Sequence, residues 1–476
     1  MSCYPRLVIA GLKGGSGKTT LSLGLIRALK EDGFKVAPYK KGPDYIDAGW
    51  LASASGCACY NLDPFLIGSE RLLSSFLNHS LGSDISVIEG NRGLFDGMDE
   101  IGSYSTAEVA KTLTAPVIVI IDCTKVTRTV AAMVLGARRF DPEVDVKGVV
   151  LNQLAGSRHE SVIRKSIERY CEVPVLGAIP RLAEAAFPER HMGLTPHQEH
   201  PQTEKAISFA GETARSYLDM EKIVRIARGA TPIMNETETR RPGDAVNAES
   251  FPRVASVVRI GAVRDSAFQF YYPENFEELK RLGADIIEFS AITEGLPSDI
   301  DALYIGGGFP ETHAIALAGN ARLRESLRNA VMDGLPVYAE CGGLMYLGEG
   351  LLLEGKTYPM TGIFPLLFSL EKRPQAHGYS SVEVVGGNPF FAKGTVLKGH
   401  EFHYSRPVNA GELKEFTFAF RMKRGRGLHE GMDGICYKNV LATYTHIHAY
   451  GASEWAGGVL RRALEFREKR RTMREA

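Results

Sequence analysis

The sequence predicts an α/β protein of two domains, each with its own sheet. Short apolar runs alternate with amphipathic stretches through the first half, a pattern typical of a parallel sheet with helices on both faces. Residues 229–252 are polar, charge-rich and without an apolar period, so we expect an interdomain linker there. A new series of apolar runs follows it. We therefore expect domains at 1–228 and 253–462, followed by a charged tail at 463–476.

The strands of the first domain are expected where apolar runs end on a polar residue or run into glycine. The predicted strands are Leu7–Ala10, Lys35–Pro38, Ile85–Glu89, Val117–Asp122, Gly148–Asn152 and Val175–Ile179. Amphipathic stretches between them, such as Leu21–Glu31 and Arg158–Glu172, predict helices. Ala206–Ile226 is predicted to be one helix that closes the domain.

The second domain is expected to be a further α/β unit. Its first predicted strands are Ser256–Ala262, Ile286–Phe289, Ala302–Ile305 and Val337–Ala339. Three later runs have a more antiparallel character, namely Ser381–Val385, Phe416–Phe420 and Val440–Tyr444.

The composition argues against several classes of protein. With 476 residues, 44% of them hydrophobic, the chain can bury full cores. Lys plus Arg (56) equals Asp plus Glu (56), which argues against a strongly basic nucleic-acid surface. No apolar run reaches the ~20 residues that span a bilayer, no cleavable leader precedes the first strand, and the seven cysteines form no zinc pattern. We expect a cytoplasmic protein with reduced thiols and no nucleic-acid or membrane partner.

The first candidate site is KGGSGKTT, Lys13 to Thr20, between a predicted strand and a predicted helix. In that context a glycine-rich turn directs backbone N–H groups at phosphate oxygens, which predicts ATP binding. Lys18 is expected to reach the outer phosphates and Thr19 to hold Mg²⁺. Asn152, at the end of a later strand, is a candidate contact for the base. The expected nucleotide-binding residues are Lys13, Gly14, Gly15, Gly17, Lys18, Thr19, Thr20 and Asn152.

This phosphate loop departs from the commonest pattern. Leu12 stands where the first glycine belongs, and Gly11 comes one residue early. The stretch fits the K-G-G-x-G-K-T form instead, with Lys13 as the extra lysine. In ATPases of that form, the extra lysine often reaches a nucleotide across a dimer interface, so a homodimer is an open expectation.

Carboxylates follow the neighbouring predicted strands. YKKGPDYID contains Asp44 and Asp47, and SVIEGNRGLFDG contains Glu89 and Asp96. Carboxylates at strand ends beside a phosphate loop suit magnesium and the positioning of a charged substrate. We expect Thr19, Glu89 and Asp44 at the metal. The expected substrate-activation residues are Asp44, Asp47 and Asp96.

The second candidate site is PVYAECGGLMYL, Pro336 to Leu347. A cysteine at a sharp strand-to-helix turn is expected to be exposed, with its thiolate stabilised by the helix N-terminus. Cys341 is therefore the predicted nucleophile, and the Gly342 N–H is the predicted oxyanion donor. A second donor is expected from Gly307 in the IGGGFPE loop.

A base for the cysteine is expected in TYTHIHAY, Thr443 to Tyr450. Alternate residues of a strand face the same way, so both histidines are candidates. His446 is the preferred one, and the role of His448 stays open. The polar stretch GHEFHYS, residues 399–405, either lines a substrate channel or supports packing.

Together these phrases resemble the cobyrinic acid a,c-diamide synthase family over nearly the whole chain. The shared phrases, in matching order, are KKGPDYIDAGW, VIEGNRGLFDG, PERHMGL, YYPENFEELKRLGADIIEFS, YIGGGFPE, AECGGLMYL and GHEFHYS. The resemblance implies an N-terminal P-loop domain with a parallel sheet, similar to dethiobiotin synthetase, and a C-terminal class I glutamine amidotransferase α/β domain. It also implies an ATP- and glutamine-dependent amidoligase that converts two acetate groups of a corrinoid or related tetrapyrrole into amides. An acyl phosphate is then the activated carboxylate, and Cys341 releases ammonia from glutamine through a thioester.

The resemblance also implies residue roles. Lys18, Thr19 and Glu89 match nucleotide and magnesium positions, and the three aspartates match the activation site. His446 matches the histidine of the related cobyric acid synthase glutaminase domain. Typical class I glutaminases carry a glutamate two residues after that histidine, a place that His448 occupies here, so a Cys–His dyad is an open expectation.

Alternatives remain at two levels. Cobyrinic acid, in cobalamin biosynthesis, is the favoured substrate, while Ni-sirohydrochlorin and hydrogenobyrinic acid are substrates of members of the same family. A partitioning-type switch ATPase shares the phosphate-loop signature, and a scaffold with an inactive thiol site shares the fold. Cys341, the IGGGFPE loop and His446 argue against the switch ATPase, and the unaltered Cys341 and His446 argue against the scaffold.

Overall fold

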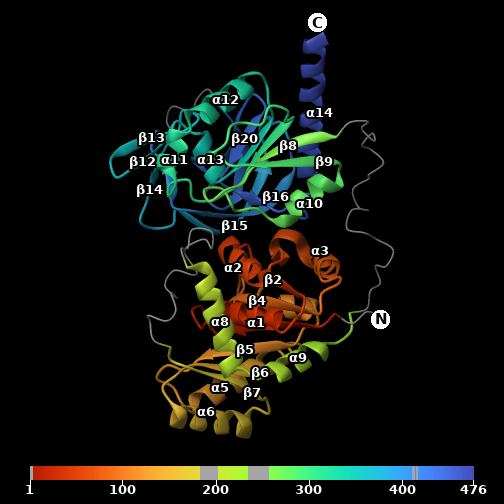
Figure 1. The fold of residues 1–476 in the computed structure, drawn as a ribbon, viewed down its shortest axis with the longest axis vertical. Helices are drawn as coiled ribbons and strands as arrows, with labels where there is room; N and C mark the ends of the chain where they lie inside the picture. The colour runs from red at the N-terminus through yellow and green to blue at the C-terminus, as the bar shows by residue number, and fades with distance from the viewer. Residues whose placement is uncertain (1–3, 183–201, 234–256, 410–412, 414–415, 476) are drawn as a thin grey trace. The chain divides into compact units, whose positions relative to one another are not determined.

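The computed structural model describes residues 4–182, 202–233, 257–409, 413 and 416–475. The chain divides into two compact units, Met1–Ala245 and Val246–Ala476, and each contains its own sheets and helices (Figure 1). Most of the predicted linker lies outside the described residues, as does the PERHMGL phrase.

The first unit is built on a seven-stranded sheet in the order β3-β2-β4-β1-β5-β6-β7. All its strand pairs are parallel, which confirms the predicted sheet. The central strand β1 is buried along its whole length, because helices cover both faces of the sheet. The strands are β1 (Arg6–Gly11), β2 (Val36–Lys41), β3 (Tyr60–Leu62), β4 (Ile85–Gly93), β5 (Val117–Asp122), β6 (Val146–Leu154) and β7 (Val175–Pro180).

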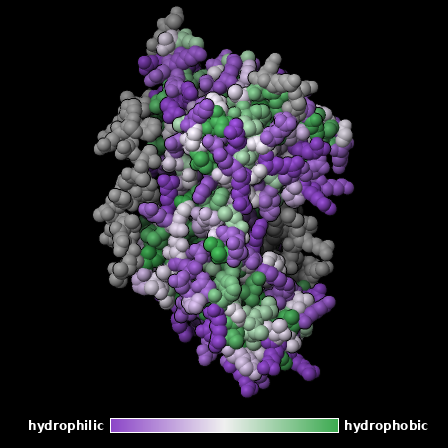
Figure 2. Space-filling model, turned by 180° about the vertical axis from the view of Figure 1, so that it is seen from behind, coloured by the Kyte–Doolittle hydropathy of each residue, from purple (hydrophilic) through white to green (hydrophobic). Residues whose placement is uncertain are grey.

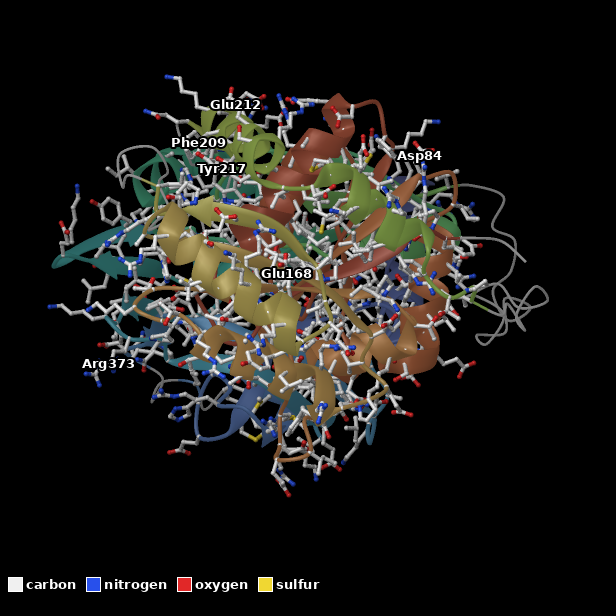
Figure 3. All side chains as sticks on the ribbon, turned by 90° about the horizontal axis from the view of Figure 1, so that it is seen from below. Asp84, Glu168, Phe209, Glu212, Tyr217 and Arg373 are labelled. Carbon is white, nitrogen blue, oxygen red and sulfur yellow. The ribbon has the colours of Figure 1, made fainter. Side chains whose placement is uncertain are left out.

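The helices of this unit are α1 (Lys18–Glu31), α2 (Tyr45–Ser55), α3 (Pro64–His79), α4 (Thr106–Thr112), α5 (Thr129–Phe140), α6 (Ser157–Tyr170), α8 (Thr203–Tyr217) and α9 (Met220–Arg228). In α6, Ile163 and Ile167 are buried, whereas Glu168 is exposed on the outer side (Figure 3). Glu212 is likewise exposed on α8. This division of apolar and charged faces is what a helix covering a sheet requires.

The prediction of one helix over Ala206–Ile226 was wrong. Leu218 is extended, with φ −111° and ψ 146°, and separates α8 from α9. Asp219 then caps α9, because its Oδ1 accepts a hydrogen bond from Lys222 N at 3.0 Å. The apolar pattern continues across the break, so it did not mark the end of the first helix.

The second unit contains a ten-stranded mixed sheet in the order β21-β16-β15-β18-β19-β20-β11-β10-β8-β9. Its strands are β8 (Val258–Val263), β9 (Ala284–Phe289), β10 (Ala302–Ile305), β11 (Val337–Glu340), β15 (Ala376–Val384), β16 (Val396–His403), β18 (Thr417–Arg424), β19 (Met432–Tyr437), β20 (Val440–Thr443) and β21 (His446–Ile447). A small sheet holds β12 (Gly350–Leu353), β13 (Lys356–Pro359), β14 (Leu367–Leu370) and β17 (Ser405–Pro407). The helices are α10 (Pro273–Arg281), α11 (Ala314–Gly319), α12 (Ala321–Met332), α13 (Gly342–Leu347) and α14 (Glu454–Glu475).

Strand β20 joins the parallel and antiparallel parts of this sheet. It pairs antiparallel with β19, as predicted for Val440–Tyr444, but parallel with β11. The antiparallel prediction was therefore incomplete, because it holds for the pairing with β19 and not for the pairing with β11. The parallel pairing brings the end of β11, which precedes Cys341, beside the segment that leads to His446.

Residues 463–475, expected to form a charged tail, continue helix α14. Ala463 is buried, and Arg470 Nη2 donates to Asp301 Oδ1 at 3.2 Å.

On the face shown in Figure 2, hydrophilic side chains predominate and hydrophobic ones form small separate patches. Among the helices of the described ranges, none combines the length and the apolar character needed to cross a membrane.

Candidate active sites

The phosphate loop connects β1 to α1 and is supported by Asn152. Gly17 has φ 94°, a left-handed conformation that favours glycine, and a Cβ there would lie 2.4 Å from Asn152 Nδ2. Asn152 Nδ2 donates to Ser16 O at 3.0 Å, and its Oδ1 accepts from Gln153 N at 2.9 Å. Both ends of this carboxamide are engaged within the protein. Asn152 therefore supports the loop, a different role from the expected contact with the base.

The two lysines of the loop have different surroundings. Lys18 Nζ donates to Lys13 O at 3.3 Å, and burial lowers the pKa of Lys18 although Glu89 opposes the shift. Lys13 Nζ lies 2.8 Å from Asp122 Oδ2 at the end of β5, and its side chain is 62% exposed. Gly14 and Gly15 are also exposed, and Thr20 is half-buried in the first turn of α1. The loop thus carries one buried lysine, Lys18, and one exposed lysine, Lys13.

A buried cluster adjoins the loop near the end of β2 and midway along β4. Thr19 Oγ1 donates to Glu89 Oε1 at 2.8 Å and to Asp47 Oδ2 at 3.4 Å. Lys40 Nζ lies 2.7 Å from Glu89 Oε1 and 2.5 Å from Asp47 Oδ2. Lys40 and Glu89 are partners in the parallel register of the two strands. Sequence reasoning missed Lys40, although the lysine pair before GPDYID, at the end of a buried strand, was a signal.

The charges of this cluster depend on one another. Burial acts to lower the pKa of Lys40, but Asp47 and Glu89 outweigh it, so the pKa is raised and Lys40 stays a cation. Burial raises the pKa of Glu89, while Lys40 opposes that shift. Burial, reinforced by the charge of Asp47, raises the pKa of Asp44 to about 7.

Asp44 and Asp96 bind backbone N–H groups. Asp44 Oδ1 accepts from Asp47 N at 3.0 Å and caps α2, and Asp96 Oδ2 accepts from Gly93 N at 2.8 Å. The aspartate in contact with Thr19 is therefore Asp47, whereas Asp44 was expected there. The sequence favoured Asp44 at the metal, and only the start of α2 shows that Asp44 caps the helix while Asp47 reaches Thr19.

The donors around Thr19 fit a divalent cation in part. Glu89 Oε2 is buried and has no hydrogen-bond partner within the described part of the chain, a costly state for a carboxylate oxygen unless a ligand binds it. Across the residues that the structure describes, no group of three or more His, Cys, Asp or Glu side chains is arranged as a complete metal site. Magnesium at a phosphate loop takes a hydroxyl, one or two carboxylates, phosphate oxygens and water. These donors therefore suit an ion whose remaining ligands come with a nucleotide.

Cys341 lies at a strained turn between β11 and α13. Its φ of 47° is rare for a residue with a side chain, and its N donates to Thr443 O at 2.7 Å. Contrary to prediction, the residue is only 4% exposed. Burial, followed by the charge of Glu311, raises the pKa of the Cys341 thiol. The Gly342 N–H at the start of α13 acts to lower the pKa of the thiol, as expected of a helix N-terminus, but burial outweighs this contribution.

His446 lies next to a carboxylate. Its Nδ1 is 3.4 Å from Glu340 Oε2, and the two side chains are 2% and 0% exposed. The other side of the ring faces the glycine loop after β10, because a Cβ on Gly307 would lie 3.1 Å from His446 Nε2. The sequence left a Cys–His dyad open, and the structure adds a carboxylate to the histidine.

His448 has different partners from His446. Its Nε2 lies 3.5 Å from Glu274 Oε2, and its Nδ1 accepts from Tyr450 N at 3.2 Å. Its ring lies 4.6 Å from the Tyr272 ring. Both histidines are buried, but they lie next to different carboxylates.

The glycine loop after β10 packs against the cysteine turn. Gly343 N donates to Gly306 O at 3.1 Å, and a Cβ on Gly342 would lie 3.0 Å from Gly308 N. Gly307 N, the predicted second oxyanion donor, donates to Phe270 O at 3.2 Å. That prediction conflicts with the structure, because the N–H is already used in the bridge to Phe270. Within the loop, Gly308 N is the donor that lies against Gly342.

The GHEFHYS stretch borders the same site. Cys341 Sγ lies 3.8 Å from Phe402 O, and the His400 ring stacks on His446 with 4.8 Å between centroids. His403 stacks on Tyr444 at 3.6 Å. Burial lowers the pKa of His403 to about 4 and that of His400 well below its ordinary value. Two neutral imidazoles thus flank the cysteine and His446 at neutral pH, which supports the packing interpretation of this stretch.

Two family models match the chain. The CobQ/CobB/MinD/ParA nucleotide binding domain matches residues 7–194, and the CobB/CobQ-like glutamine amidotransferase domain matches residues 259–453. The first match contains the phosphate loop and its carboxylates, and the second contains the cysteine turn and His446.

Curated relatives align over both units. The cobyrinate a,c-diamide synthase of Magnetococcus marinus is 42% identical over 453 residues, which cover 95% of this chain and 96% of the relative. The enzyme of that name from Archaeoglobus fulgidus is 38% identical over 97% of this chain and 98% of its own. That from Listeria monocytogenes serotype 4b is 39% identical over 94% of this chain and 96% of its own. These relatives therefore match both units of the chain over nearly their full length.

Proposed function

The chain belongs to the cobyrinate a,c-diamide synthase family, and we propose that it amidates the a- and c-acetate carboxylates of cobyrinic acid in cobalamin biosynthesis. ATP activates each carboxylate, and glutamine supplies the nitrogen. The observation that carries this proposal is the presence of two unlike sites in one chain. One is a phosphate loop with buried carboxylates, and the other is a buried cysteine turn packed against a glycine loop that borders His446.

The two sites supply what amide formation from a carboxylate requires. Hydroxide is a poor leaving group, so the carboxylate needs activation, and phosphate leaves readily. Ammonia at neutral pH is mostly ammonium, which is no nucleophile. Releasing ammonia inside the protein keeps it unprotonated for the activated carboxylate. Neither site alone completes the reaction with glutamine.

In the glutaminase step, Cys341 transfers its thiol proton to His446 and its sulfur attacks the side-chain amide carbon of glutamine. The carbon–nitrogen bond breaks, and the proton leaves with ammonia, so that a thioester remains. Water then hydrolyses the thioester to glutamate and restores the thiol. Because burial raises the pKa of Cys341, the resting site holds a neutral thiol, and proton transfer to His446 accompanies the attack. Gly342 N and Gly308 N are the donors proposed for the oxyanion.

In the activation step, a substrate carboxylate oxygen attacks the γ-phosphorus of ATP, ADP leaves and an acyl phosphate forms. Ammonia attacks the acyl carbon, and phosphate departs to leave the amide. Lys18 neutralises charge on the outer phosphates, and Lys40 pairs with Glu89 and Asp47 beside them. Asp44, Asp47 and Asp96 are proposed to position the substrate carboxylate.

Thr19, Glu89 and Asp47 are the side chains that would hold magnesium. A bound magnesium ion neutralises phosphate charge during transfer. The partnerless Glu89 Oε2 supports its presence within the described cluster.

The substrate is tested by measuring ADP release with magnesium and glutamine while cobyrinic acid, hydrogenobyrinic acid and Ni-sirohydrochlorin are offered in parallel. Mass spectrometry checks each product for two new amides. We expect the fastest release and the diamide product with cobyrinic acid. Preference for either other macrocycle would keep the two-site chemistry and replace the substrate. ADP release with none of them would contradict the proposed activity.

A further inference from the structure

The base of a cysteine nucleophile needs a group that fixes its ring orientation and tautomer. The position two residues after His446 holds His448, which cannot supply a carboxylate. His448 is itself engaged, with Nδ1 accepting from Tyr450 N at 3.2 Å and Nε2 3.5 Å from Glu274 Oε2. The orienting group for His446 therefore comes from another part of the chain.

Glu340 occupies the required place. Its Oε2 lies 3.4 Å from His446 Nδ1, and its side chain is fully buried. The opposite edge of the imidazole, with Nε2, faces the glycine loop that packs against the cysteine turn. A carboxylate at Nδ1 favours the tautomer with its proton there, and Nε2 is then left as the base.

We propose that Glu340 is the positioning residue of the glutaminase site and holds His446 in the orientation and tautomer that accept the Cys341 proton. This inference rests on the proposed function of the second unit. In this arrangement, the nucleophile and the residue that orients its base are neighbours in sequence. Glu340 ends β11, and Cys341 lies in the turn that follows.

The surroundings of Glu340 hold the carboxylate in place. Its Oε1 accepts from Ile447 N at 3.2 Å, and its Oε2 accepts from the Tyr304 hydroxyl at 3.3 Å. Tyr304 in turn accepts from Asn275 Nδ2 at 3.1 Å. On the other face of His446, the stacked His400 ring is held at Nδ1 by the Tyr272 hydroxyl at 3.2 Å. Strands β10, β11, β16 and β21 thus all contribute to the position of one imidazole.

The central test is Glu340→Gln in the full chain. Glutamine keeps an acceptor for Ile447 N and the side-chain volume, but it removes the charge that supports the imidazolium. Loss of the orienting carboxylate in a serine protease lowers kcat by about 10⁴-fold. We expect glutamine-dependent kcat to fall by about 10²- to 10⁴-fold with a smaller change in KM, and the pH profile of kcat/KM for glutamine to change. ADP release supported by ammonium salt is expected to stay within about twofold.

Two controls separate positioning from structural damage. Glu274→Gln removes the carboxylate of the second buried His–Glu pair and is expected to change glutamine-dependent kcat by less than about fivefold. Glu340→Asp keeps the charge with a shorter reach and is expected to restore part of the activity lost in Glu340→Gln. Circular dichroism of each variant monitors folding.

A second readout does not depend on the substrate. Peptide mass spectrometry after iodoacetamide treatment reports the alkylation rate of Cys341 against pH, and the exposed Cys57 serves as an internal reference. We expect Glu340→Gln to alter the pH profile of Cys341 alkylation and to leave that of Cys57 unchanged. If the wild-type protein hydrolysed no glutamine while this shift appeared, the proposed function would fail and the positioning role would stand. Unchanged kinetics and alkylation in Glu340→Gln, or equal losses in Glu340→Gln and Glu274→Gln, would overturn the inference.

Discussion

Lys40 controls the charge of the cluster beside the phosphate loop. It is a buried cation 2.7 Å from Glu89 Oε1 and 2.5 Å from Asp47 Oδ2, and it opposes the rise that burial causes in the pKa of Glu89. Without Lys40, burial would raise the pKa of Glu89 further, toward the neutral form that binds cations poorly. A structural cation thus maintains the acidic character of a proposed metal and substrate site.

Replacing Lys40 by methionine is therefore expected to damage both stability and activity. Lys40→Met leaves two buried carboxylates without their cation, which is expected to lower the free energy of unfolding by roughly 3 kcal/mol. Urea unfolding measures the loss, and ADP release is expected to disappear with either nitrogen source. Glu89→Gln in the same chain should return part of the lost stability, because it removes one of the uncompensated charges. Additive losses in the double variant would contradict the coupling.

Glu401 predicts a pH dependence of stability in the second unit. Burial, reinforced by the charge of Asp433, raises the pKa of Glu401 from 4.5 to about 7. The folded protein therefore holds a proton there that the unfolded chain releases. This contribution to stability is complete below about pH 4.5 and is lost as the pH rises through about 7.

The measurement is the free energy of urea unfolding at pH 5 and pH 8 for the wild type and Glu401→Gln. The decrease between the two pH values is expected to be about 1–3 kcal/mol smaller in the variant, because glutamine does not titrate. Equal decreases in both proteins would show that Glu401 has an ordinary pKa in the fold.

At the scale of elements, close contacts between helices and strands position the two sites. Helix α1 begins at Lys18 of the phosphate loop, and Gly24 in α1 lies against the backbone of α8. A Cβ on Gly24 would lie 2.3 Å from Ala210 O. In the second unit, the parallel pair β11–β20 places Glu340 opposite Thr443, so the turn that carries Cys341 and the segment that leads to His446 follow neighbouring strands.

The contact of α1 with α8 is tested by Gly24→Ala. The added methyl group must displace backbone, so we expect a loss of about 1–3 kcal/mol in unfolding free energy despite the better helix propensity of alanine. Gly136→Ala is a matched control, because Gly136 lies exposed in α5 and a Cβ there would meet nothing within 4 Å. The control is expected to gain about 0.5–1 kcal/mol. Equal stability of the two variants would contradict the close packing of the helices.

At the scale of the whole molecule, each compact unit contains one of the two candidate sites and its own core. The phosphate loop and Lys40 cluster belong entirely to the first unit, and the Cys341 site belongs entirely to the second. This separation predicts that the two half-reactions can be lost independently.

Cys341→Ala is expected to abolish amidation with glutamine and to keep amidation with high ammonium salt. Glu89→Gln is its counterpart, and we expect it to remove amidation with both nitrogen sources while glutamine hydrolysis continues. Product mass and glutamate release are the two measurements. Loss of ammonium-supported amidation in Cys341→Ala would contradict the division of labour. Full amidation in Glu89→Gln would remove Glu89 from the activation site.

The local motifs were predictable because consecutive residues encode them. KGGSGKTT lies between β1 and α1 as expected, and Cys341 occupies the predicted strand-to-helix turn. The predicted strands of the first domain were also found, because buried parallel strands are continuous apolar runs. Short or polar elements such as β3 and β21 lacked such a signal. The break between α8 and α9 was missed because the apolar period continues across Leu218.

The sequence by itself determined the fold class, the two kinds of site and the two residues most suited to chemistry, Lys18 and Cys341, since each depends on a short local pattern. Only the tertiary structure decided which groups surround them. Lys40 meets Glu89 across 49 residues of sequence, and Glu340 meets His446 across 106. Burial of the Cys341 thiol and use of the Gly307 N–H were likewise decided by neighbours distant in the chain. Such pairings follow from strand register and desolvation, which are properties of the assembled sheets.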